Sequence, residues 1–86
     1  MTFEFDPDKS AANLRKHGID FEEAQALWKD GNLFELPLMS EGEARVLMIG
    51  VIGAKHWAAI VTYRSGAVRI ISVRRARDVE IGCYEG

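Results

Sequence analysis

The sequence predicts an α+β domain in which two N-terminal helices pack on a four-stranded antiparallel meander sheet and a short helix closes the chain. Three observations predict this fold. Helix-start and helix-stop signals occupy residues 6–32, apolar and β-branched runs occupy residues 33–73, and a two-residue turn separates the last two runs. With 86 residues the chain has the size of one compact domain, so we expect residues 1–86 to form a single unit.

The first helix is expected to begin after Asp6 and to end at Gly18, following a short extended segment, Phe3-Glu-Phe5. Asp6 is a favourable N-cap, and Pro7 suits the first helical position. Gly18 readily adopts the left-handed conformation that ends helices, and Ile19 can supply the hydrophobic contact that follows.

The second helix is expected to span Asp20 to Lys29. Asp20 and Glu23 have the spacing of a capping box, in which each side chain bonds the backbone of the other residue. Apolar residues then recur at helical spacing, so the helix should bury one face; they are Phe21, Ala24, Leu27 and Trp28. Lys29-Asp-Gly-Asn32 should end it.

The remainder of the chain reads as extended. The expected strands are Leu33–Met39, Arg45–Ile52, Trp57–Arg64 and Val68–Val73. Pro37 favours an edge position for the first of them, because proline cannot donate to a neighbouring strand. Ser40–Glu43 should form a turn and Gly53–His56 a loop, while Ser65-Gly66 fits a two-residue hairpin. The tail, Ala76–Gly86, is expected to contain the short closing helix.

Composition excludes several classes of protein. A formal charge of −2 argues against coating of nucleic acid by bulk electrostatics, although residues 41–86 carry seven Lys/Arg against five Asp/Glu. The single cysteine, Cys83, excludes an intrachain disulfide, and no Cys/His set has zinc-ligand spacing. We find no cofactor motif, signal peptide or run long enough to span a membrane. We therefore expect a cytoplasmic protein with no metal, cofactor or membrane partner.

The stretch Arg69-Ile-Ile-Ser-Val-Arg-Arg-Ala-Arg77 holds four arginines and no acid. The arginine side chain suits phosphate, because its donors form a planar fork and its charge persists at neutral pH. Strict alternation would place Arg69, Ile71, Val73 and Arg75 on one face of a strand. Arg64 and Arg45 stand at the ends of neighbouring strands and could reach the same rim. The alternative is a set of solvated or paired arginines facing Glu41, Glu43 or Glu80.

Three further side chains could take part in proton transfer. Glu80 and Tyr84 lie four residues apart and would share a face of a helical tail, although an ordinary surface pair would look the same. His56 could act as a base or stack on RNA from its expected loop. His17 stands at a helix end, where a histidine usually interacts with the last carbonyls.

Five stretches occur in an order that resembles the BrnT family of toxins from bacterial type II toxin–antitoxin systems. They are Phe3-Glu-Phe-Asp-Pro-Asp-Lys9, Asn13-Leu-Arg-Lys-His-Gly-Ile19, Phe21-Glu-Glu-Ala24, Glu43-Ala-Arg45 and Arg69-Ile-Ile-Ser-Val-Arg-Arg-Ala76. Phe5 stands where the family usually has tryptophan, which is a conservative aromatic change. The resemblance extends to about Tyr84.

The resemblance implies a RelE-like fold and a metal-independent ribonuclease that cuts RNA and inhibits translation. It also implies a BrnA-type antitoxin with a ribbon-helix-helix-like DNA-binding region, through which the complex would contact operator DNA. The catalytic residues it implies are Arg64, Arg69, Arg75, Glu80 and Tyr84, and the RNA-binding residues expected beside them are Arg45, His56, Arg74 and Arg77. The alternative is a non-catalytic interaction module that keeps the fold and the antitoxin-binding surface.

Overall fold

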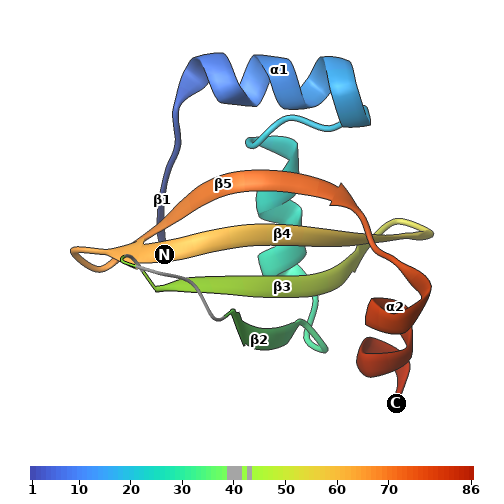
Figure 1. The fold of residues 1–86 in the computed structure, drawn as a ribbon. Helices are drawn as coiled ribbons and strands as arrows, with labels where there is room; N and C mark the ends of the chain where they lie inside the picture. Colours follow the sequence, from blue (N-terminus) through green and yellow to red (C-terminus); the bar gives the residue numbers. More distant parts are fainter. Residues whose placement is uncertain (39–41, 43) are drawn as a thin grey trace.

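The computed structural model describes residues 1–38, 42 and 44–86, which are built around one five-stranded sheet (Figure 1). In chain order the elements are β1 (Thr2–Glu4), α1 (Pro7–His17), the 3₁₀ helix η1 (Glu23–Lys29), β2 (Phe34–Leu38), β3 (Arg45–Ile52), β4 (Lys55–Arg64), β5 (Ala67–Arg75) and α2 (Asp78–Glu85). The order across the sheet is β1-β5-β4-β3-β2. None of the helices in the described residues is long and apolar enough to cross a membrane.

The expected four-stranded antiparallel meander is wrong, although the α+β class is right. Strands β2 to β5 do form a meander, but β1 adds a fifth strand that pairs in parallel with β5, with Phe3 opposite Val68. Three residues are too few to show a strand period, and the partner strand lies near the other end of the chain. Local pattern therefore could not reveal this pair.

Helix α1 has the predicted ends. The Asp6 carboxylate accepts a hydrogen bond from the Asp8 N–H at 2.9 Å, and Pro7 occupies the first turn. Gly18 has φ of 79° and donates its N–H to the Leu14 carbonyl at 2.9 Å. These local capping signals fix where the helix begins and ends.

The second helix differs from the prediction in its type and in its first residue. Asp20 and Glu23 do exchange backbone-to-carboxylate bonds of 3.1 and 2.7 Å, as a capping box should. The helix that follows is a seven-residue 3₁₀ helix, η1, and not an α-helix from Asp20. Phe21, Ala24 and Leu27 are all at most 1 % exposed. The spacing of three between Ala24 and Leu27 matches the three residues per turn of a 3₁₀ helix, and Phe21 lies three residues earlier, in the turn before η1.

The two faces of the sheet are covered unequally. The inner face packs on η1 and on the segment before it, and the largest fully buried side chains of this core include Phe21, Leu27 and Ile70. The outer face has a smaller cluster around Leu47, Ile49 and Ala58, against which Tyr84 of α2 packs. Figure 1 shows η1 behind the sheet and α2 at one end of it, so much of the outer face is left without a covering helix.

The turns largely follow the prediction. Pro37 lies in the edge strand β2, and Ser65 and Gly66 have positive φ of 51° and 81°, as a tight hairpin requires. The β3–β4 turn is shorter than expected, because Lys55 and His56 already belong to β4. The end of the expected first strand, Met39, and most of the Ser40–Glu43 turn lie outside the described residues.

A bulge in β5 overturns the predicted alternation of its side chains. Ile60 pairs with Ser72 but Val61 pairs with Ile70, so Ile71 is the extra residue. Val73 consequently joins Val68 and Ile70 in the inner core cluster. Arg69 and Arg75 therefore lie on opposite faces of the sheet, whereas strict alternation placed them together.

Candidate functional site

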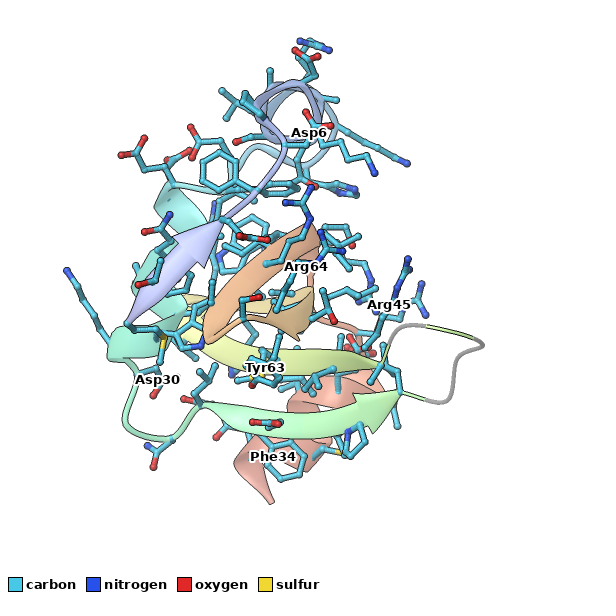
Figure 2. All side chains as sticks on the ribbon, turned by 90° about the vertical axis from the view of Figure 1, so that its left-hand side faces the viewer. Asp6, Asp30, Phe34, Arg45, Tyr63 and Arg64 are labelled. Atoms are coloured by element: carbon cyan, nitrogen blue, oxygen red, sulfur yellow. The ribbon has the colours of Figure 1, made fainter. Side chains whose placement is uncertain are left out.

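Three arginines from three strands lie around Thr62 on the outer face. Val46 pairs with Val61, which places Arg45 beside Thr62, and Arg69 pairs with Thr62 from the other side. Arg64 follows two residues later on the same face of β4. Figure 2 looks along the sheet from this end, with Arg45 and Arg64 at the near ends of β3 and β4. We call Arg45, Arg64 and Arg69 the arginine cluster.

Thr62 gives the arginine cluster a rigid centre. Its side chain is 1 % exposed, and its hydroxyl donates to the Ala44 carbonyl at 2.6 Å. Arg69 donates to Glu4 on β1 at 3.4 Å, with about a third of each side chain exposed. An exposed pair of this length contributes little, on the order of 0–1 kcal/mol. A phosphate could therefore replace the Glu4 carboxylate at low cost.

Arg74 and Glu80 form a bidentate ion pair at the junction of β5 and α2. The guanidinium donates two bonds of 2.8 Å to the two carboxylate oxygens, and Glu80 also accepts the Arg77 N–H at 2.8 Å. The Arg74 bonds hold the pKa of Glu80 below its usual value, although burial opposes them. Glu80 is 8 % exposed. This geometry joins β5 to the start of α2 and leaves the carboxylate fully engaged.

Arg75 lies at the other end of β5, on the inner face. Its guanidinium carbon is 5.5 Å from the centre of the Trp57 ring, and its Nε donates to the His56 carbonyl at 3.3 Å. A cation over an aromatic face is a stabilising arrangement. Arg75 and the arginine cluster are therefore not brought together.

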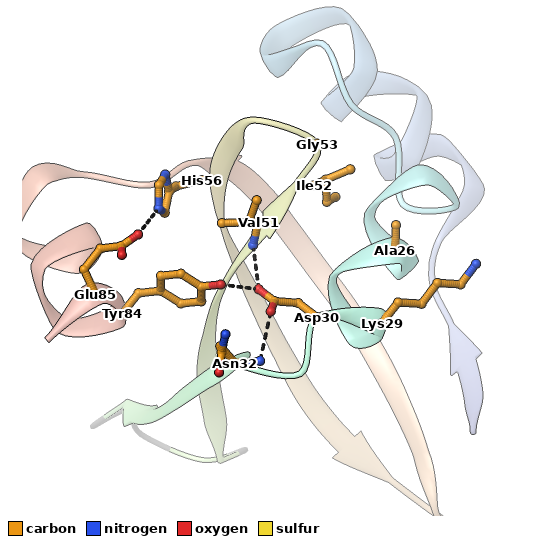
Figure 3. A pocket seen from close by; sticks show the side chains of 10 residues that line it. All are labelled: Ala26, Lys29, Asp30, Asn32, Val51, Ile52, Gly53, His56, Tyr84 and Glu85. Carbon is orange, nitrogen blue, oxygen red and sulfur yellow. Dashed lines mark hydrogen bonds and ion pairs between the residues drawn. The ribbon is translucent and has the colours of Figure 1, made fainter.

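His56 and Tyr84 line a cleft of about 500 Å³ at the far end of β4 (Figure 3). His56 Nε2 is 2.8 Å from Glu85 Oε1, and the His56 and Tyr84 rings meet edge to face at 5.4 Å. The Tyr84 hydroxyl donates to Asp30 Oδ2 at 2.6 Å. Asp30 is fixed in turn by the N–H groups of Asn32 and Val51 at 2.9 and 3.0 Å.

The contact between Asp30 and Tyr84 changes the acidity of both groups. The hydrogen bond from Tyr84 is the main cause that lowers the pKa of Asp30, and the two backbone N–H bonds act in the same direction. The same bond raises the pKa of Tyr84 to about 12, with burial and the nearby Asp30 and Glu85 charges contributing. At neutral pH the pair is therefore a phenol donating to a carboxylate.

No functional role was predicted from the sequence for Asp30 or Glu85. Asp30 was expected only to help end the second helix, and Glu85 lies in the terminal turn. The Asp-Gly sequence after a helix is a recognisable turn signal, but it does not reveal that the carboxylate reaches Tyr84, which is 54 residues away. The predicted partner Glu80 does pair with an arginine, whereas Glu41 and Glu43 lie outside the described residues.

In the part of the chain that the structure describes, no group of three or more His, Cys, Asp or Glu side chains is arranged to hold a metal ion. Chemistry by side chains alone would draw on arginines for charge and on the His56–Glu85 and Tyr84–Asp30 pairs for proton transfer.

Comparison with known proteins identifies the family. No curated protein matches the chain. The model of one family, described as the ribonuclease toxin BrnT of type II toxin–antitoxin systems, matches residues 5–80. This match includes the arginine cluster and ends before Tyr84 and Glu85. The chain belongs to the BrnT family of ribonuclease toxins, and such a toxin has an antitoxin partner.

Proposed function

We propose that this chain is a metal-independent endoribonuclease whose arginine cluster binds the RNA backbone, so that cleavage inhibits translation. The observation that supports the proposal most is the convergence of Arg45, Arg64 and Arg69 on a sheet face that has no covering helix at that end. Arginines bind phosphate through charge-assisted and often bidentate hydrogen bonds. We also propose that residues 1–86 form one toxin domain acting in the cytoplasm.

The predicted catalytic residues divide into separate groups. Arg64 and Arg69 are positioned to bind RNA phosphates, and we propose this role for them. Arg75 and Arg74 are engaged with Trp57 and Glu80, respectively. Arg77 lies next to this pair, where its N–H bonds Glu80. Tyr84 packs against His56 in the cleft. His56 precedes Thr62 by six residues on β4, and six residues of extended strand span about 20 Å. The cleft and the arginine cluster are therefore about 20 Å apart.

The proposal is tested by binding and cleavage of single-stranded RNA in EDTA. We expect Arg69→Ala to weaken binding about tenfold or more, because it removes a charge-assisted contact. The slope of log affinity against log salt should fall by about 0.7, the value for one phosphate contact on a single strand. Arg15→Ala, an exposed arginine on α1, is the matched control. Wild-type protein that fails to cleave RNA in EDTA would refute the metal-independent ribonuclease.

One observation favours the alternative of a non-catalytic interaction module. Glu80, the base implied by the family resemblance, is engaged by Arg74 and by the Arg77 N–H. A protein without another base would bind RNA or antitoxin and leave RNA intact. The same assay separates the two functions, because the module predicts salt-dependent RNA binding by wild-type protein with no cleavage product.

We further propose that the antitoxin is of the BrnA type and that the complex contacts operator DNA only through it. The support is the family itself, since a type II system pairs the toxin with a protein antitoxin. Co-expression with the protein encoded beside the toxin gene should give a stable complex that no longer cleaves RNA. A complex in which cleavage persists would contradict neutralisation by that partner.

A further inference from the structure

The cleft in Figure 3 unites side chains from three separate parts of the chain around one imidazole. Asp30 follows η1, His56 is the second residue of β4, and Tyr84 and Glu85 end α2. His56 has 23 % of its side chain exposed, so a ligand in the cleft could reach it. A histidine held by a carboxylate and packed on a second fixed group has the arrangement of a base with its orienting partners.

We propose that this cleft is the acid–base centre of the ribonuclease, with His56 as the general base and one RNA nucleotide as the bound group. The inference rests on the proposed ribonuclease function and supplies the base that Glu80 does not. The family model matches residues 5–80, so Glu85, the residue that holds His56, lies outside this match.

The contact with Glu85 determines which nitrogen of His56 can accept a proton. Nε2 bonds to Glu85 Oε1, so in the neutral ring Nε2 carries the hydrogen and Nδ1 keeps its lone pair. The charged groups around the ring are Glu85 of α2, Asp30 after η1 and Arg75 of β5, whose Nε bonds the His56 carbonyl. Tyr84 adds a neutral phenol. The carboxylate of Glu85 would stabilise the imidazolium that forms when Nδ1 takes up a proton.

The reaction can be written with every proton placed. Nδ1 of His56 takes the proton of the ribose 2′-hydroxyl, and O2′ forms a bond to the adjacent phosphorus. The bond from phosphorus to O5′ breaks, and O5′ takes a proton from water. The resulting hydroxide accepts the proton from His56 and restores the neutral ring. The products are a 2′,3′-cyclic phosphate and a 5′-hydroxyl end.

Asp30 acts as a positioning residue in this scheme. Two backbone N–H groups fix its carboxylate, which accepts the Tyr84 hydroxyl, and the Tyr84 ring then supports the edge of the imidazole. Lys29 lines the same cleft on a flexible stem and is a cation that could move to the phosphate. The arginine cluster shares the outer face of β4 with His56 and could hold RNA about 20 Å along the strand.

The first test is single-turnover cleavage of an RNA oligonucleotide in EDTA by wild-type protein, His56→Ala and His17→Ala. We expect His56→Ala to cleave roughly 100-fold or more slowly, as removal of a general base usually does. Its RNA affinity should stay within about twofold of wild type, and added imidazole should restore part of the rate. His17→Ala changes the other histidine of the chain and should cleave like wild type.

A second variant keeps the inference testable if His56→Ala fails to fold. Glu85 has 60 % of its side chain exposed, so Glu85→Gln should fold normally. We expect it to cleave more slowly with unchanged RNA affinity, because the ring loses the carboxylate that orients it. A contact that only docks α2 would leave the cleavage rate unchanged.

The outcomes separate the inference from the proposed function. Wild-type cleavage in EDTA that His56→Ala retains within about threefold would overturn the acid–base centre and leave the ribonuclease standing. An unchanged cleavage rate in Glu85→Gln would also overturn it. Wild-type protein that binds RNA without cleaving it would refute both.

Discussion

Asn13 connects α1 to the sheet, and its removal should destabilise the protein strongly. The side chain is 7 % exposed. Its amide donates to the carbonyls of Ile19 and Val73 at 2.8 and 2.9 Å, and its oxygen accepts the Val73 N–H at 3.2 Å. Because β1 pairs with β5 only as far as Arg69, Asn13 bonds Val73 at a point that β1 does not reach.

We expect Asn13→Ala to lower the free energy of unfolding by about 3 kcal/mol. Three hydrogen bonds contribute about 1 kcal/mol each, and their loss leaves backbone groups of Ile19 and Val73 unpaired in a buried site. With roughly 4–8 °C per kcal/mol for a domain of this size, the melting temperature should fall by about 12–24 °C. Urea unfolding followed by circular dichroism measures the change.

Two variants isolate the cause. Asn32→Ala is the matched control, because Asn32 is exposed and bonds Asp30 through its backbone; its effect should stay below about 0.5 kcal/mol. Asn13→Asp preserves the volume but presents a carboxylate to two carbonyl oxygens, so it should destabilise at least as much as Asn13→Ala. A loss below about 1 kcal/mol in Asn13→Ala would show that these bonds do not hold α1 on the sheet.

Three further predictions concern stability. Glu80→Gln should destabilise the fold by about 1–2 kcal/mol at pH 7. The Arg74 bonds lower the pKa of Glu80 in the folded protein. Their stabilising contribution is therefore present above the ordinary glutamate pKa of about 4.3 and is lost as pH falls through the folded-state pKa. Urea titrations of both proteins at pH 7 and pH 3 should therefore show the difference shrinking at pH 3. Gly50→Ala should cost about 2 kcal/mol in chemical denaturation, because the added Cβ would lie 2.8 Å from Leu33 Cδ1, 3.0 Å from the buried Leu27 Cδ2 and 3.2 Å from Asp30 Oδ2. Ser65→Asn should raise the melting temperature by a few degrees, since asparagine accepts the φ of 51° better than serine; a lower melting temperature would contradict this explanation.

Local signals in the sequence predicted those parts of the fold that are determined locally. Asp6 and Gly18 cap α1 through contacts within four residues, and Ser65-Gly66 turns the chain through its own backbone angles. Pro37 indicated an edge strand because its missing N–H is a property of that residue alone. In each case the physical cause lies within a few residues of the element.

The features that the sequence did not predict depend on contacts between distant residues. Nothing in the Asn13 motif shows that its amide bonds Val73, 60 residues later. The sequence does not reveal the β5 bulge at Ile71 either, because the apolar pattern of the strand is compatible with a regular strand. The prediction of the candidate site was affected most, because the bulge determines which arginines lie on the same face of the sheet.

The arginine run that the sequence singled out is consequently not one phosphate site. Of the four arginines in the run, only Arg69 belongs to the arginine cluster. The Arg74 side chain and the Arg77 N–H both donate to Glu80 at the start of α2. Arg75 bonds the carbonyl of His56 and lies over Trp57. One end of the run thus faces the surface proposed to bind RNA, and the other end fixes the helix that brings Tyr84 and Glu85 to His56. Because the bulge lies between these two ends, the same short strand can hold the substrate on one face and build the cleft at its end.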